Sequence, residues 1–193
     1  ASQDLGKAVD ALVFDQVCTA TDTVWKKAEP VAAAVKDALQ ERGIVGKAQH
    51  RIEWNYDGVD CSGVVDLFCP DSWQFYELKT INDCSTSNIV KQIELYGYDM
   101  QYAAYAQGLL MLDSNEMGAP LGQFIFVETT APYDVRFVPI SQAMAKAGQD
   151  RWLEAIKLWA KCMRENVWPG RGDFTAEPSP YRKKQAADDW INQ

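Results

Sequence analysis

The sequence predicts an α/β fold in which a β-sheet is flanked by α-helices. Two observations carry this prediction. Segments with helical and strand patterns alternate along the chain, and 47% of the 193 residues are hydrophobic while 24% are charged, a balance typical of a domain that buries a full core. Apolar runs are far shorter than the roughly 20 residues needed to cross a bilayer, and no export signal is visible. We therefore expect a soluble protein.

The N-terminal part is expected to contain two helices followed by three strands. Residues 8–14 have the pattern of a short apolar helix, and residues 30–42 that of a second one, with Pro30 in its first turn and Gly43 at its C-terminal cap. Strands are predicted at residues 51–56, 59–68 and 73–79, separated by the turn sequences Asp57-Gly58 and Pro70-Asp71-Ser72.

The second half is expected to contain a helix, two strands and a final helix. Between residues 87 and 112 apolar side chains recur every three or four positions, which is the helical period, and residues 141–166 show the same period. Residues 123–129 and 133–139 are predicted strands around a Thr-Ala-Pro turn. Neither a repeat nor a linker divides the chain, so we expect a single domain over residues 1–193 whose basic tail, residues 171–193, is irregular.

The cysteines and the distribution of charge limit the kinds of metal site that the sequence is expected to form. Five cysteines without a C-x-x-C pair favour reduced thiols in the cytoplasm, and they lack the four closely grouped ligands of a zinc or iron–sulfur site. Residues 50–145 hold 13 acidic against 4 basic side chains, a net charge of −9 within a total of −8. Such an excess usually lies on a solvated surface. The alternative is a carboxylate cluster that binds a divalent cation.

Asp66, Glu77 and Lys79 favour the carboxylate cluster. Glu77 and Lys79 are two residues apart, so both side chains leave the same face of a strand. Asp66 is expected at the end of the preceding strand. If the two strands pair through the turn at residues 70–72, the two carboxylates approach each other beside the Lys79 amine. Neighbouring carboxylates repel unless a proton or a cation lies between them, which predicts a site for Mg²⁺ or Mn²⁺.

A simpler interpretation is that Glu77 and Lys79 form an exposed charge pair. The strand is otherwise apolar and aromatic, with Trp73, Phe75 and Leu78, and a long helix follows it. We therefore expect a central strand, where unpaired charge is costly. This context favours a functional site.

The order Asp66, then Glu77-x-Lys79, resembles the signature of the PD-(D/E)XK nucleases. The helix that follows adds Gln101 and Tyr105, similar to the Q-x-x-x-Y motif of the RecB-like exonuclease branch. The resemblance implies a restriction-endonuclease-like core, a mixed β-sheet flanked by α-helices. Within this superfamily the chain most resembles the RecE-type exonucleases (exodeoxyribonuclease VIII family). The segments that carry this closer resemblance are residues 6–15, Glu53-Trp54, Tyr98-Asp-Met-Gln101 and Trp168-Pro-Gly170.

The resemblance also implies a metal site. Asp66 and Glu77, with the Leu78 carbonyl and Asp10, would hold one or two divalent ions. The family usually carries a metal-binding His where this chain has Asp10. Asp can bind Mg²⁺ through oxygen, so the site is expected to survive; the alternative is a DNA-binding module with impaired catalysis.

Other residues take supporting roles by the same resemblance. Lys79 would orient the attacking water or stabilise developing charge. Gln101 and Tyr105, four apart on one helix, would position Lys79 or a DNA phosphate, although Tyr105 also fits a purely packing role. Glu53 is the candidate auxiliary carboxylate, with a solvated side chain as the alternative. His50 is expected to be structural or on the surface.

The function implied is a Mg²⁺- or Mn²⁺-dependent exonuclease that degrades double-stranded DNA from its ends, in recombination or phage DNA metabolism. An endonuclease or resolvase on the same core is the alternative. The resemblance further implies a homo-oligomeric ring, a single-strand annealing recombinase as partner, no membrane, and the cytoplasm of a bacterium or of an infected host cell. Because DNA binding needs local positive charge, the candidate DNA contacts are Lys26, Lys27, Lys91, Arg171, Arg182, Lys183 and Lys184.

Overall fold

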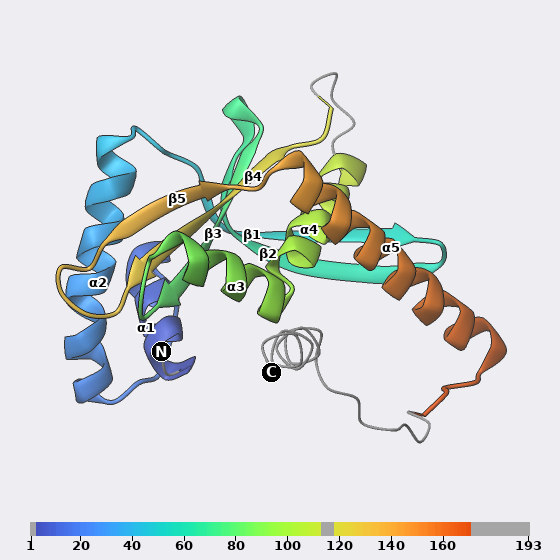
Figure 1. Cartoon of the computed structure of the whole chain (residues 1–193), viewed down its shortest axis with the longest axis horizontal. Coiled ribbons are helices and arrows are strands. Elements are labelled where there is room, and N and C mark those ends of the chain that lie inside the picture. Colours follow the sequence, from blue (N-terminus) through green and yellow to red (C-terminus); the bar gives the residue numbers. More distant parts are fainter. Residues whose placement is uncertain (1–2, 113–117, 171–193) are drawn as a thin grey trace, which may run out of the picture. The chain divides into compact units, whose positions relative to one another are not determined.

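The computed structural model describes residues 3–112 and 118–170 (Figure 1). The chain divides into two units, Ala1–Lys161, which contains the sheet, and Cys162–Gln193. In the second unit the described residues are the end of the last helix and residues 166–170. The predicted tail, residues 171–193, lies outside the described residues. Within the described ranges, no helix is long and apolar enough to cross a membrane.

Five strands form one sheet in the order β1-β2-β3-β4-β5. The first three, β1 (Lys47–Tyr56), β2 (Val59–Cys69) and β3 (Gln74–Ile81), form the predicted antiparallel meander. β4 (Leu121–Glu128) runs parallel to β3, and β5 (Val135–Pro139) pairs antiparallel with β4. The sheet is therefore mixed, and β3 is its central strand, as the sequence predicted.

Two different connections join the strands of the meander. Asp57 and Gly58 both have positive φ, 51° and 79°, the conformation that lets a two-residue turn follow the twist of an antiparallel pair. Between β2 and β3 lies the short helix η1 (Pro70–Ser72). Its proline has no N–H to lose at the first helical position.

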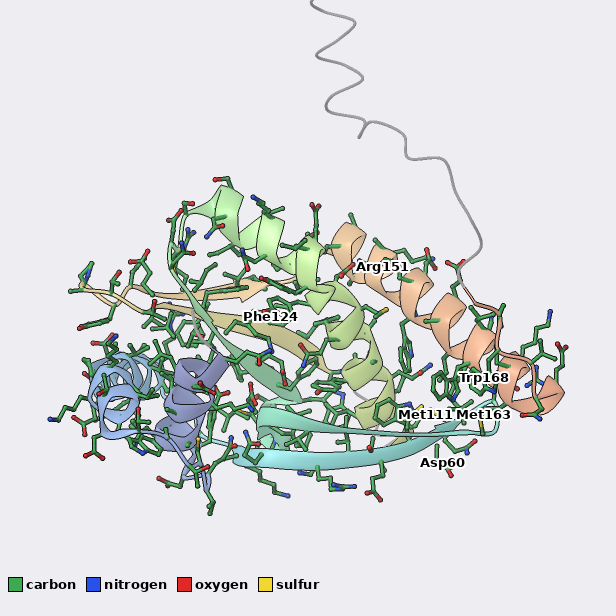
Figure 2. All side chains as sticks on the ribbon, turned by 90° about the horizontal axis from the view of Figure 1, so that it is seen from below. Asp60, Met111, Phe124, Arg151, Met163 and Trp168 are labelled. Atoms are coloured by element: carbon green, nitrogen blue, oxygen red, sulfur yellow. The ribbon has the colours of Figure 1, made fainter. Side chains whose placement is uncertain are left out.

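Helices α3 (Thr86–Tyr96), α4 (Tyr98–Leu112) and α5 (Gln142–Glu165) contribute apolar side chains to one face of the sheet. Phe124 on β4 faces these helices (Figure 2) and packs with Ile89 and Ile93 of α3. A neighbouring cluster on the same side contains Trp54, Phe75 and Leu109, with Trp152 of α5 partly buried against it.

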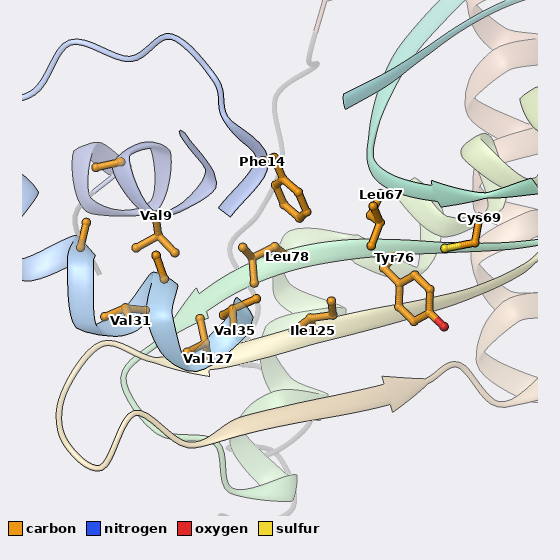
Figure 3. Packing of buried hydrophobic residues seen from close by; sticks show 13 residues of the cluster. Val9, Phe14, Val31, Val35, Leu67, Cys69, Tyr76, Leu78, Ile125 and Val127 are labelled. Atoms are coloured by element: carbon orange, nitrogen blue, oxygen red, sulfur yellow. The ribbon is translucent and has the colours of Figure 1, made fainter. Parts of the chain in front are cut away.

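Helices α1 (Gln3–Phe14) and α2 (Asp22–Glu41) cover the other face (Figure 3). Their apolar side chains pack against alternate residues of the three inner strands. Because both faces of β3 and β4 are covered, nearly every residue of these strands is withdrawn from solvent. The members of this cluster that Figure 3 labels are Val9, Phe14, Val31, Val35, Leu67, Cys69, Tyr76, Leu78, Ile125 and Val127.

Three predicted helix boundaries are wrong. The first helix was predicted from residue 8, but α1 begins at Gln3. The single helix expected over residues 87–112 is two helices, because Gly97 takes a left-handed conformation with φ 66° and its N–H bonds to the Ile93 carbonyl, which ends α3. The second helix begins at Asp22, so Pro30 lies inside it. Burial of Ala28 before the proline and Val31 after it supplies packing that outweighs the hydrogen bond lost at Pro30.

Candidate active site

The pairing of β2 with β3 places Asp66 opposite Glu77. Residues 67–69 pair with residues 74–76, and the next position in this register brings the two acidic residues together. At this position side-chain carboxylates, and not backbone carbonyls, accept hydrogen bonds from the backbone of the facing strand. The Asp66 N–H donates to Glu77 Oε1 at 3.2 Å, and the Leu78 N–H donates to Asp66 Oδ2 at 2.8 Å. Asp66 was predicted at the end of its strand, but β2 continues to Cys69. The acidic pair therefore forms where the two strands separate.

Lys79 lies beside this pair, on the same face of β3 as Glu77. Its Nζ donates to Glu77 Oε2 at 3.2 Å, and only 16% of the side chain is exposed. The ammonium also lies 5.0 Å from the centre of the Tyr98 ring, a geometry in which the ring attracts the cation. Two different contacts therefore fix the position of the amine.

Helix α4 adds two polar side chains, Gln101 and Tyr105, to the site formed by β2 and β3. Gln101 Nε2 donates to Glu77 Oε2 at 2.9 Å and lies 3.3 Å from the Tyr105 hydroxyl. The two residues are one helical turn apart, so their side chains share a face of α4. The structure thus brings together the five residues predicted as catalytic: Asp66, Glu77, Lys79, Gln101 and Tyr105.

Burial controls the charge of this cluster. Glu77 is 2% exposed, and burial together with the charge of Asp66 raises its pKa to about 8. Burial also raises the pKa of Asp66, against the opposing effect of Lys79. For Lys79, burial lowers the pKa, but the Glu77 and Asp66 carboxylates outweigh it, so that the net shift is upward. Near neutral pH the cluster consequently keeps a proton on a carboxyl group unless another cation is present.

Asp10 reaches the same region from α1. With Leu78, Lys79 and Tyr98 it lines a cavity of about 390 Å³. Burial and the charge of Asp66 raise the pKa of Asp10 to about 7, while Lys79 lowers it. The Asp10 carboxyl therefore lies close enough to Asp66 and Lys79 for their charges to change its pKa. Among the residues that the structure describes, however, no three His, Cys, Asp or Glu side chains are gathered closely enough to hold an ion as they stand.

Glu53, the predicted auxiliary carboxylate, is not brought to this cluster. It lies on β1 opposite Ser62, its side chain is 65% exposed, and it accepts a hydrogen bond from Arg51 Nε at 2.7 Å. Its neighbours Ile52 and Trp54 are buried against the α4 side, so the alternation of the strand turns Glu53 outward. The role predicted for Glu53 has no support from this placement.

Gln49 and Lys7 also lie at the site and were not predicted there, although Lys7 belongs to the segment 6–15 that resembles the RecE-type exonucleases. Gln49 Nε2 donates to Asp66 Oδ1 at 3.2 Å, and its backbone has φ 50°. Lys7 lines the cavity of Asp10, one helical turn before it. Tyr98 begins another of these segments, Tyr98-Asp-Met-Gln101, and its ring lies next to the Lys79 ammonium.

The predicted DNA contacts are dispersed. Lys26 and Lys27 are exposed on α2, and Lys91 is exposed on α3. His50 stacks on Phe68 at 4.9 Å between ring centres, which suits the structural role expected for it. The remaining candidates, Arg171, Arg182, Lys183 and Lys184, lie outside the described residues.

Residues 19–177 match the family described as a PDDEXK-like domain of unknown function (DUF3799). The chain belongs to this family. Its predicted membership of the PD-(D/E)XK superfamily is thereby confirmed, while the narrower resemblance to RecE-type exonucleases stays a prediction. No curated protein matches the sequence.

Two solved structures are similar to this PDDEXK-like chain. One is a protein from Eubacterium rectale provisionally described as an exonuclease, with a TM-score of 0.69 and 14% identity, covering 94% of this chain and 78% of that one. The other is a phage-related exonuclease from Haemophilus somnus 129PT, with a TM-score of 0.47 and 15% identity, covering 84% and 83%. The first likeness, with the family match, confirms the predicted restriction-endonuclease-like α/β core.

Proposed function

We propose that the chain is a metal-dependent DNA nuclease that hydrolyses phosphodiester bonds from the ends of double-stranded DNA. The observation that carries this proposal is the buried arrangement in which Glu77 contacts both Asp66 and Lys79, in a chain of the PDDEXK-like family. The similar protein from Eubacterium rectale is itself provisionally described as an exonuclease, which supports an exonuclease over other nucleases.

The side chains at the site fit a divalent cation such as Mg²⁺ or Mn²⁺. The Asp66 and Glu77 carboxyl groups adjoin one another in a buried environment that raises both pKa values, so a bound cation would replace the proton that otherwise neutralises them. All the donors are oxygens, which Mg²⁺ and Mn²⁺ prefer. The groups that would hold the ion are the carboxylates of Asp66, Glu77 and Asp10 and the carbonyl of Leu78. When bound, it would supply a water of lowered pKa and neutralise charge on the phosphate.

The protein's own residues would then position the reacting groups. Lys79 carries a raised pKa and stays protonated, so it can donate to the attacking water or to a phosphate oxygen. Gln101 holds Glu77 Oε2 from the helix side. The Tyr105 hydroxyl next to Gln101 is free to rotate toward either the amide or a phosphate.

Linear and covalently closed duplexes of the same sequence test the proposal. With Mg²⁺, we expect the linear form to disappear progressively from its ends while the closed circle persists. EDTA and the Glu77→Gln variant should each stop the loss. Nicking or linearisation of the circle would favour the endonuclease alternative, and binding without loss of either form would favour a DNA-binding module.

A homo-oligomeric ring would account for action at ends, because a closed ring can be loaded only where the duplex stops. It would also let a few exposed lysines from several subunits act together on one duplex. The mass of the protein in solution, measured by light scattering, tests this part of the proposal. A mass of about 21.7 kDa, that of one chain, would exclude the ring.

A further inference from the structure

Gln49 on β1 lies opposite Asp66 on β2 and holds its carboxylate. The residues on either side of Gln49 pair with those on either side of Asp66. The Gln49 amide Nε2 donates to Asp66 Oδ1 at 3.2 Å, while the Leu78 N–H donates to the other oxygen, Oδ2, at 2.8 Å. Both oxygens of this carboxylate are therefore fixed, one from each of the two strands that flank β2.

The backbone of Gln49 is unusual for a residue of a β-strand. Its φ is 50°, in the left-handed region that residues other than glycine seldom adopt and in which asparagine is several-fold more common than most of them. This conformation costs free energy, and residues that keep it tend to lie at functional sites. The position of Gln49, in contact with a predicted catalytic carboxylate, fits that tendency.

The alternation of β2 is interrupted at the same place. In a regular strand, residues two apart point to the same face. Val65, however, belongs to the apolar cluster that contains Leu109 of α4, whereas Leu67 packs in the cluster under α1 and α2 (Figure 3). The side chains of β2 thus change faces at Asp66, and the left-handed residue of β1 lies directly opposite. The two strands are distorted together where β2 contributes its carboxylate to the site.

An amide suits a carboxylate that must stay available to a cation. It donates a hydrogen bond without carrying charge, so it orients Asp66 and leaves the negative charge in place. Gln101 does the same for Glu77 from α4, at 2.9 Å. Each carboxylate oxygen has a second lone pair that a metal ion can use. A lysine or arginine in place of Gln49 would instead add a positive charge that competes with the ion.

We propose that Gln49 is a positioning residue that orients the Asp66 carboxylate for a divalent cation. This inference rests on the proposed function, in which Asp66 is one of the groups that would hold the ion. The competing explanation is that the amide only joins β1 to β2. The backbone argues against it, because an extended residue would pair these strands without the cost of a left-handed φ.

Two substitutions separate the amide of Gln49 from its backbone. Gln49→Met keeps the length of the side chain and removes the donor, while the left-handed backbone stays unfavourable. Gln49→Asn is one methylene shorter, so its amide no longer reaches Asp66 from a contact already at the long end of hydrogen-bond distances, but asparagine tolerates this φ better. Calorimetry on the full chain should show an Mn²⁺ affinity about 10- to 100-fold lower in both variants. In EDTA, the melting temperature of Gln49→Asn should be at or above that of the parent.

Cleavage of linear duplex DNA gives a second readout. The Mn²⁺ concentration for half-maximal cleavage should rise by the same factor as the calorimetric loss. At saturating Mn²⁺, kcat should return to within a few-fold of the parent, because a residue that acts through Asp66 touches no reacting atom. Gln74→Asn is the matched control, since Gln74 is also a half-buried strand glutamine but accepts a hydrogen bond from the Tyr76 hydroxyl, at 2.6 Å. Its Mn²⁺ affinity should equal that of the parent.

The outcomes distinguish this role from the proposed function itself. Parental Mn²⁺ affinity in either folded variant, or an equal loss in Gln74→Asn, would overturn the positioning role and leave the nuclease proposal intact. If Gln49→Met does not fold by circular dichroism, Gln49→Asn alone decides. A parent that binds no Mn²⁺ would overturn the metal site of the proposed function, and this inference with it.

Discussion

Adjacent residues of β3 meet opposite environments on the two faces of the sheet. Tyr76 and Leu78 enter the apolar cluster under α1 and α2 (Figure 3), whereas Glu77 and Lys79 face α4, where Gln101 and a second carboxylate contact them. Burying charge is costly unless partners compensate it. A side chain such as Glu77, 2% exposed and hydrogen-bonded to the Asp66 backbone, Lys79 and Gln101, is thus a poor choice for stability and a good one for chemistry.

This contrast predicts which substitutions should affect the reaction and which should affect the stability of the fold. On the α1–α2 face, truncation of an apolar side chain should lower stability and leave the chemistry of the folded protein unchanged. On the α4 face, conservative changes should remove activity with little loss of stability. The following experiments test this division, beginning with the largest expected effect.

Replacing Glu77 by Gln should reduce DNA cleavage by a factor on the order of 10³ or more. The substitution keeps size and removes the charge that would bind the metal, and the loss of one positioned charge is commonly worth 10²–10³ in rate. Calorimetry should show that Mn²⁺ binding is lost as well. Glu128→Gln is the matched control, because Glu128 also accepts from a backbone N–H, that of Cys84 at 2.7 Å, but does not line the Asp10 cavity. Equal Mn²⁺ affinity in the parent and Glu77→Gln would contradict the assignment.

Replacing Lys79 by Ala should lower kcat by a factor on the order of 10². The amine is held by Glu77 and the Tyr98 ring and makes no contribution to the apolar clusters, so the melting temperature should stay near that of the parent. Lys91→Ala, at an exposed position on α3, controls for the loss of a positive charge near DNA. Cleavage by Lys79→Ala at the parental rate would remove this residue from the mechanism.

Leu78→Ala tests the opposite face through stability. Leu78 is 4% exposed within the α1–α2 cluster, and such truncations usually cost about 2–5 kcal/mol. We expect the midpoint of urea unfolding to fall accordingly, while the folded variant keeps a kcat within a few-fold of the parent, since its carbonyl is unchanged. A loss of kcat as large as that of Lys79→Ala, in a stable protein, would show that the two faces are not separable.

The sequence could predict the two faces of β3 because strand periodicity is local. The alternation around Glu77 and the spacing to Asp66 depend only on strand geometry and a short connection, and the structure has both. The break at Gly97 could not be seen, because the apolar period runs through it and a single glycine is compatible with either outcome. The contact of Gln49 with Asp66 depends on register between segments 17 residues apart, and no local pattern encodes which residues meet there.

The smallest expected effect concerns stability as a function of pH without divalent cations. Glu77 has a pKa of about 8 in the folded protein, against an ordinary value of 4.5, so between these values the folded state retains a proton that the unfolded state has lost. The contribution of Glu77 is therefore fully present below about pH 4.5 and is lost as pH rises through 8. Glu77→Gln cannot lose that proton. In EDTA, the melting temperature of the variant relative to the parent should rise by a few degrees between pH 5 and pH 8.5, whatever constant offset the amide introduces. Thermal unfolding followed by circular dichroism measures this difference, with Glu128→Gln again as the control. A difference that is constant with pH would mean that Glu77 is already ionised in the folded protein and that Lys79 alone balances the pair.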